Sequence, residues 1–236
     1  MARLPILMYH NVSKMDGLGQ GLTISESKLE DQFRYLKEKG FTCFHLSELE
    51  KLKNIPSKSV VITFDDVTLN QLELAVPLLN KYKLKATFFI PFQYIGQADL
   101  WNEGKEAIMD AEMLQSLDAS IELGLHSYAH QKYSTLSDDE IKSDFEGCYG
   151  SIRVNNLNVY PALAYPYGNF PKKEPRKSQF QKLLQDQNIK MGLRIGNRVN
   201  RFPFKNPYEI NRIDIKGEDS LLKFKLKLRL GKLRLF

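Results

Sequence analysis

The chain has 236 residues, of which 42% are hydrophobic and 26% are charged, and this excludes a disordered body and suits one large α/β domain. The net charge of +6 equals the contribution of residues 221–236, which hold six bases and no acid, so 28 bases balance 28 acids in the remainder. The basic excess therefore belongs to a tail and does not indicate a nucleic-acid-binding face.

The N-terminal segment, the lengths of the apolar runs and the two cysteines indicate the kind of protein and its expected location. The N-terminal segment is too short and too soon polar for a secretory signal, and no apolar run approaches the roughly 18 residues of a membrane span. We therefore expect a cytoplasmic protein. Cys43 and Cys148 lack partners at short spacing, which argues against a disulfide framework or a zinc knuckle.

Short apolar runs alternate with amphipathic stretches along the chain. We predict strands at Pro5–Tyr9, Phe41–His45, Val60–Phe64, Ala86–Pro91, Ser120–Leu125, Ala162–Pro166, Met191–Ile195 and Ile210–Ile215. We predict helices at Ser27–Lys39, Ser47–Lys53, Asn70–Tyr82, Asp110–Leu117, Ser137–Asn155 and Lys177–Gln187. Ser47 precedes Glu50 in the spacing of a capping box. Such alternation predicts parallel strands joined by crossovers, and about eight strands indicate a distorted (β/α) barrel over residues 1–220.

Two adjacent acids, Asp65 and Asp66, follow the predicted strand Val60–Phe64, and a histidine pair, His126 and His130, occurs some sixty residues later. Together they offer the oxygen and nitrogen ligands of a divalent metal plus one spare carboxylate, which is what metal-assisted hydrolysis requires. The alternative is a strand end with two solvated acids and an unrelated histidine pair in a loop.

These polar residues share one position relative to the predicted strands. Asp65 and Asp66 end one strand, His126 follows another, and Tyr167 follows a third. In a (β/α) barrel the carboxyl ends of the strands meet on one rim, where catalytic residues collect. The motifs are therefore expected to converge on a single site.

Three segments carry this candidate chemistry: Thr63-Phe64-Asp65-Asp66, His126-Ser127-Tyr128-Ala129-His130 and Ala164-Tyr165-Pro166-Tyr167-Gly168. In that order they resemble the first three signature motifs of the polysaccharide deacetylases, the family-4 carbohydrate esterases with a NodB-type domain. The resemblance covers roughly residues 4–215. It implies a distorted (β/α) barrel that hydrolyses an acetamido group on a sugar, usually N-acetylglucosamine, with a divalent cation held by one Asp and two His.

Carried over by position, Asp65 is the general base, and Asp66, His126 and His130 are the metal ligands. The chemistry supports this division independently, because three ligands leave a coordination position open for water and for the amide oxygen. The carboxylate beside the ligating one can then take the proton from water. The resemblance also implies that the backbone N–H of Tyr167 helps to stabilise the oxyanion.

The general acid departs from the usual pattern. Most family members place it in a late Leu-x-x-His motif, yet no histidine follows His130. Leu7-Met8-Tyr9-His10 is itself a Leu-x-x-His on the first predicted strand, which lies beside the last strand in a closed barrel. This order resembles the poly-N-acetylglucosamine deacetylase branch. We therefore predict His10 as the general acid; the alternative is a structural histidine.

Smaller departures concern the surroundings of the acid pair. Val67 stands where a glycine is common, and Ala164 replaces an arginine that often precedes the Pro-Tyr motif, so another group must orient Asp65. Arg212 is preferred over Arg194 because its segment resembles a late one in this branch. Trp101 and Tyr128 are candidates to stack on a sugar but are more often core residues, and His45 is expected to be structural.

The C-terminal segment 221–236 interleaves leucine with lysine and arginine. Strict alternation from Leu222 to Leu230 favours a strand. Two interpretations stay open: an element packed on the domain, or a basic amphipathic segment resting on anionic lipid at the inner face of a membrane.

The leading hypothesis from the sequence is a metal-dependent N-deacetylase of an acetamido-sugar polysaccharide or glycoconjugate. Zinc is the expected metal, with cobalt, nickel and iron as alternatives, because two histidines and one carboxylate suit all four. An O-acetyl esterase and a catalytically silent glycan- or metal-binding module are the other candidates.

Overall fold

The structure is a computed structural model that describes residues 1–231, apart from the side chain of Leu18. Its strands are β1 (Ala2–Leu4), β2 (Ile6–Tyr9), β3 (Asn11–Ser13), β4 (Thr23–Ser25), β5 (Thr42–Cys43), β6 (Ser59–Asp65), β7 (Ala86–Ile90), β8 (Ile121–Leu125), β9 (Val159–Ala164), β10 (Met191–Ile195), β11 (Asn200–Phe202) and β12 (Ile210–Asp214). Its α-helices are α1 (Glu26–Glu38), α2 (Leu46–Glu50), α3 (Val76–Tyr82), α4 (Ala111–Ser116), α5 (Asp138–Val154), α6 (Arg176–Asp186) and α7 (Leu221–Leu230).

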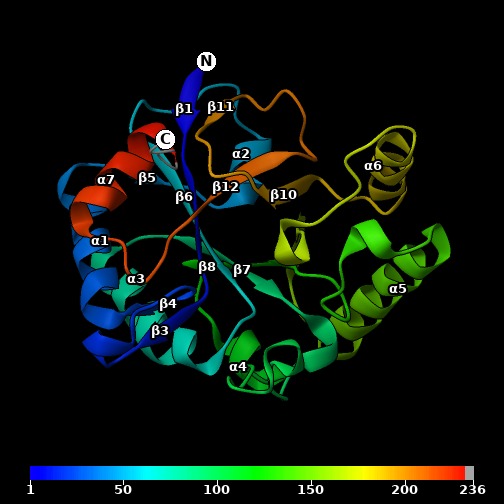
Figure 1. Cartoon of the computed structure of the whole chain (residues 1–236), viewed down its shortest axis with the longest axis horizontal. Helices are drawn as coiled ribbons and strands as arrows, with labels where there is room; N and C mark the ends of the chain where they lie inside the picture. Colours follow the sequence, from blue (N-terminus) through cyan, green and yellow to red (C-terminus); the bar gives the residue numbers. More distant parts are fainter. Residues whose placement is uncertain (232–236) are drawn as a thin grey trace.

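Seven of the described strands form a closed parallel barrel. The order around the ring is β2, β12, β10, β9, β8, β7 and β6, and pairing of β6 with β2 closes it. Helices surround the ring, with α1 and α7 on one side and α5 and α6 on the other (Figure 1). The predicted (β/α) barrel is confirmed, but the segment Phe41–His45 forms only the short strand β5 outside the ring, paired with β6.

Alternation along the strands divides the core into two layers. Leu7 and Ile62 belong to the outer cluster, which packs beneath helices such as α1. Ile6 and Val61 belong to the inner cluster, which fills the barrel. Because successive side chains point to opposite faces, both neighbours on each strand are buried, and this explains why β2 and β6 are apolar without interruption.

Two predicted helices differ from the observed ones for local reasons. Helix α2 begins at Leu46, and the Glu48 carboxylate accepts the His45 N–H at 2.8 Å, so the predicted cap at Ser47 is wrong. The segment predicted as one helix from Asn70 to Tyr82 is a π-helical turn at Gln71–Ala75 followed by α3. Pro77 has no N–H for a regular helical bond, which accounts for the change.

The alternating segment from Leu222 to Leu230 is a helix, and the prediction of a strand is wrong. Ser220 caps it by accepting the Lys223 N–H, and Phe224 and Leu228, four residues apart, are buried. The Phe224 ring packs edge-on against Tyr35 of α1. Burial of these two residues against the domain on one helical face outweighs the alternating pattern. Residues 232–236 of the predicted tail lie outside the described part of the chain.

None of the described helices is both long enough and apolar enough to cross a bilayer.

Candidate active site

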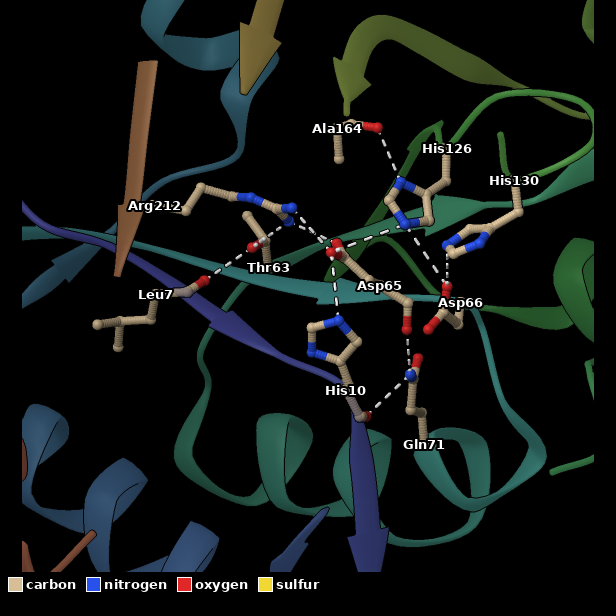
Figure 2. Close-up of polar contacts among 10 residues, drawn as sticks. All are labelled: Leu7, His10, Thr63, Asp65, Asp66, Gln71, His126, His130, Ala164 and Arg212. Carbon is tan, nitrogen blue, oxygen red and sulfur yellow. Dashed lines mark hydrogen bonds and ion pairs between the residues drawn. The ribbon is translucent and has the colours of Figure 1, made fainter. Parts of the chain in front are cut away.

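The predicted site residues meet at the carboxyl end of the barrel. Asp65 ends β6 and Asp66 follows it, while His10 follows β2 and His126 follows β8. Figure 2 shows these side chains pointing toward one another from separate strands, with Arg212 of β12 reaching in from the other side. Parallel strands bring their ends to one rim, which explains why segments far apart in the sequence converge here.

Asp66, His126 and His130 form a compact group of metal-ligand type. One ligand atom from each lies within 4.8 Å of the others. The Asp66 Oδ1 atom is 3.5 Å from Nε2 of each histidine. Ligands bound tetrahedrally at about 2.1 Å from a zinc ion are roughly 3.4 Å apart, so the spacing fits such an ion.

The ring of His126 is held in the orientation that a ligand needs. Its Nδ1–H donates to the carbonyl of Ala164 at 2.8 Å, because a carbonyl can only accept. Nε2 therefore carries the lone pair and faces Asp66.

The loop between the two histidines is anchored by Asp144 of α5. Its carboxylate accepts the Tyr128 N–H at 2.9 Å, the Ala129 N–H at 3.3 Å and the Tyr133 hydroxyl at 2.7 Å.

The electrostatics of this group favour a bound cation. Burial raises the pKa of Asp66 well above its usual range, and the charges of Asp65 and Asp99 raise it further. Burial lowers the pKa of His126 to about 4 and that of His130 to about 2, so both imidazoles are neutral at neutral pH. Asp66 Oδ1 is buried without a hydrogen-bond partner among the described residues. A divalent ion would compensate the charge of the Asp66 carboxylate and accept the Nε2 lone pairs of His126 and His130, so these three residues suit a metal site.

Asp65 has a different environment from its neighbour. Arg212 donates from Nη1 to Oδ1 at 2.5 Å and from Nη2 to Oδ2 at 2.8 Å, and its side chain is fully buried. Burial acts to raise the pKa of Asp65, but the charge of Arg212, followed by those of His126 and His10, lowers it below the usual range. Asp65 is therefore ionised, with its charge held by a bidentate arginine.

His10 lies on the other side of Asp65, with its Nε2 3.6 Å from Asp65 Oδ2. Burial lowers its pKa, while the carboxylates of Asp65 and Asp214 act to raise it. The backbone here is fixed by Gln71, whose side-chain amide donates to the carbonyls of His10 at 2.9 Å and Asp65 at 2.6 Å. Figure 2 shows Gln71 bridging the two segments.

The loops that carry these residues include several left-handed backbone positions. Asp66 has a φ of 77°, Val67 of 44°, Ser127 of 67°, His130 of 53° and Tyr167 of 57°. A β-branched residue such as Val67 rarely adopts this conformation, and clustering of such residues is typical of functional sites.

A pocket of about 650 Å³ opens over the cluster. The ring of Trp101 stacks on His130 with centroids 4.1 Å apart, and the half-exposed Tyr167 meets His130 edge-on at 4.9 Å. Trp101 therefore lines the pocket as well as packing beside a candidate ligand. The volume is sufficient for a sugar residue.

Other residues that the sequence singled out lie elsewhere. Arg194 approaches Glu209 at 3.7 Å and so is engaged away from Asp65. Tyr128 packs over Gly147 of α5. His45 contacts the carbonyl of Ser120 through Nε2 at 2.9 Å, which is a structural role.

Three residues that the sequence did not single out support the site: Gln71, Asp144 and Asp214. Each acts through a backbone contact or a charge across the fold, and no motif spacing identifies such a partner. Only the position of Asp214 near the end of the predicted strand Ile210–Ile215 was a usable signal.

Comparison with known proteins gives several relatives. YxkH of Bacillus subtilis is 29% identical over 176 residues, which cover 72% of this chain but only 58% of that protein. The poly-beta-1,6-N-acetyl-D-glucosamine N-deacetylase of Staphylococcus aureus is 26% identical over 243 aligned residues, covering 90% of this chain and 78% of that enzyme.

Among solved structures, IcaB from Ammonifex degensii superimposes with a TM-score of 0.78 at 22% identity, covering 97% of this chain and 98% of that one. At this identity the likeness shows a shared fold. The family model for polysaccharide deacetylase matches residues 53–185, which include Asp65, Asp66, His126, His130 and Tyr167. The chain belongs to the polysaccharide deacetylase family.

Proposed function

We propose that this protein removes N-acetyl groups from a polymer of N-acetylglucosamine, using a divalent metal held by Asp66, His126 and His130. The observation that carries the proposal is the contrast between two adjacent acids. Asp66 Oδ1 lies 3.5 Å from Nε2 of both neutral imidazoles, whereas both oxygens of Asp65 accept hydrogen bonds from Arg212 and, of the candidate ligands, its Oδ2 approaches only His126, at 3.8 Å. The name of the Staphylococcus aureus relative supports the choice of sugar.

The ligand set suits zinc, and also cobalt, nickel or iron. When bound, such an ion supplies Lewis acidity and lowers the pKa of water toward neutrality. Three protein ligands leave room for water and substrate.

Asp65 serves as the general base in this proposal. It accepts a proton from the attacking water while the water oxygen bonds to the acetyl carbon. Arg212 keeps the carboxylate ionised and fixes both of its oxygens, so the acceptor is ready before substrate arrives.

His10 serves as the general acid. When the C–N bond breaks, the sugar nitrogen takes a proton from His10, and the products are acetate and a free amino sugar. His10 must be protonated beforehand: burial and the charge of Arg212 lower its pKa, and the charges of Asp65 and Asp214 act against this lowering.

Tyr167 is proposed to donate its backbone N–H to the developing oxyanion. Its side chain borders the same pocket, beside His130.

Paired variants test this assignment. Asp65→Asn should retain bound metal in elemental analysis but lose acetate release from N-acetylglucosamine oligomers, on the order of a thousandfold. His126→Ala should lose both the metal and the activity. A fully active Asp65→Asn variant would contradict the mechanism.

The substrate class needs a separate comparison. Acetate release from N-acetylglucosamine oligomers and from an O-acetylated polysaccharide should be measured side by side on the same metal-loaded protein. Release from the ester alone would indicate an esterase. Binding of oligomers with no release from either substrate would indicate a silent glycan-binding module.

A further inference from the structure

Two adjoining hollows lie beside the end of α7 and the start of β2, and the first extends along the segment from Gly196, which follows β10, to Arg201 of β11. The first, of about 680 Å³, is lined by Arg3, Arg198 and Arg201 together with Leu230. The second, of about 360 Å³, shares Arg3 and Leu230 and adds further bases. The six bases of this surface, here called the basic face, are Arg3, Lys58, Arg198, Arg201, Lys225 and Arg229.

Among the described residues, no acid lines either hollow. Within residues 1–231, none of the six side chains forms an ion pair, although the chain outside 221–236 holds equal numbers of acids and bases. Five of the six are exposed, and only Lys225 is half-buried. Uncompensated like charges repel one another and favour a negatively charged partner.

The fold assembles this face from separate parts of the chain. In register, Arg3 of β1 pairs with Arg201 of β11, and this places two cations side by side. Helix α7 brings Lys225 and Arg229, while its other bases, Lys223 and Lys227, pair with Asp219, and of these two only Lys227 is buried. The described bases of α7 therefore have two roles: Lys223 and Lys227 pair with Asp219, and Lys225 and Arg229 belong to the basic face.

We propose that the basic face binds the phosphate groups of anionic phospholipids and so seats the protein on a membrane surface. Exposed arginine and lysine around an exposed leucine, Leu230 at 58% exposure, are the composition that such an interface favours. Arginine forks also match phosphate geometry.

The position of the face sets the orientation of the bound protein. Arg3 and Lys58 precede β2 and β6, whereas His10 and Asp65 stand at the far ends of those strands. β6 spans roughly 20 Å at 3.3 Å per residue. A protein seated through Arg3 and Lys58 would therefore present its candidate active site away from the lipid, with Arg198, which follows β10, at the edge of the contact.

Vesicle sedimentation tests the proposal. The whole chain should sediment with vesicles of mixed phosphatidylcholine and phosphatidylglycerol, but not with phosphatidylcholine alone, and added salt should release it. The triple variant Arg3→Gln, Arg198→Gln, Arg201→Gln should bind the mixed vesicles roughly a hundredfold more weakly.

A matched control removes the same charge from the other side of the molecule. Arg153→Gln, Lys173→Gln, Lys182→Gln changes three exposed bases on or beside α5 and α6 and should sediment like the unchanged chain. Circular dichroism melting of both triple variants checks that they fold. Equal losses in the two variants, no preference for phosphatidylglycerol, or binding to heparin without binding to vesicles would each overturn the proposal.

Discussion

The charged side chains at the two ends of the barrel differ in burial and in pairing. At the carboxyl rim, Asp65 and Arg212 are buried and satisfy each other within the chain. On the basic face, Arg3 and Arg201 are exposed and have no acid beside them among the described residues. Buried charges cost several kcal/mol unless they are paired, so the rim must be built precisely. Exposed charges destabilise the fold little, so the role of the basic face is set by the partner that binds it.

The largest expected contrast is between two arginines. Arg212→Met leaves Asp65 buried and uncompensated, so we expect a loss of about 3–5 kcal/mol in the free energy of unfolding. Arg201→Met on the basic face should leave this free energy nearly unchanged. Urea denaturation of both variants measures the difference. Equal free energies of unfolding in the two variants would show that the ion pair between Asp65 and Arg212 does not stabilise the fold.

Metal binding should stabilise the rim in particular. A divalent ion at a hundredfold excess over its dissociation constant adds about 2.7 kcal/mol to the free energy of unfolding. Thermal melting with and without zinc checks this, and His126→Ala should show no such shift. If His126→Ala still gained the full stabilisation from zinc, the metal would have to bind at another site.

Helix α7 offers the same comparison within a single element. Lys227 is buried, pairs with Asp219 and donates to the carbonyl of Asp214 at 2.6 Å. Lys227→Met should cost about 2 kcal/mol of stability. Lys225→Met, on the basic face, should cost much less in the same denaturation series. The reverse order would mean that α7 is held by its exposed side.

The smallest effect concerns the loop between the histidines. Asp144→Asn replaces one acceptor oxygen of this anchor with a donor, and we expect about a tenfold loss of zinc affinity by calorimetry. Asp139→Asn, an exposed acid on the same helix, is the control. Unchanged affinity in Asp144→Asn would show that the loop holds its shape without this carboxylate.

Local patterns predicted the barrel because its strands are short apolar runs between amphipathic helices. The exceptions have tertiary causes. The alternation from Leu222 to Leu230 indicates a strand in isolation, but Phe224 and Leu228 are buried against the domain as one helical face. Phe41–His45 is apolar enough for a strand, yet the ring closes directly between β2 and β6 and leaves β5 outside.

The location in the cytoplasm and the identity of the metal stay predictions. The roles of the individual site residues are proposals, and the distances between these residues support them.

The sequence by itself determined the ligand types, their order and the strand ends that carry them, because periodicity and motif spacing are local properties. Tertiary structure decided which arginine holds Asp65, which carboxylate acts on His10 and how the bases of α7 divide between interior and surface. The pairing of Asp65 with Arg212 joins residues 147 positions apart, and only closure of the barrel brings them within reach.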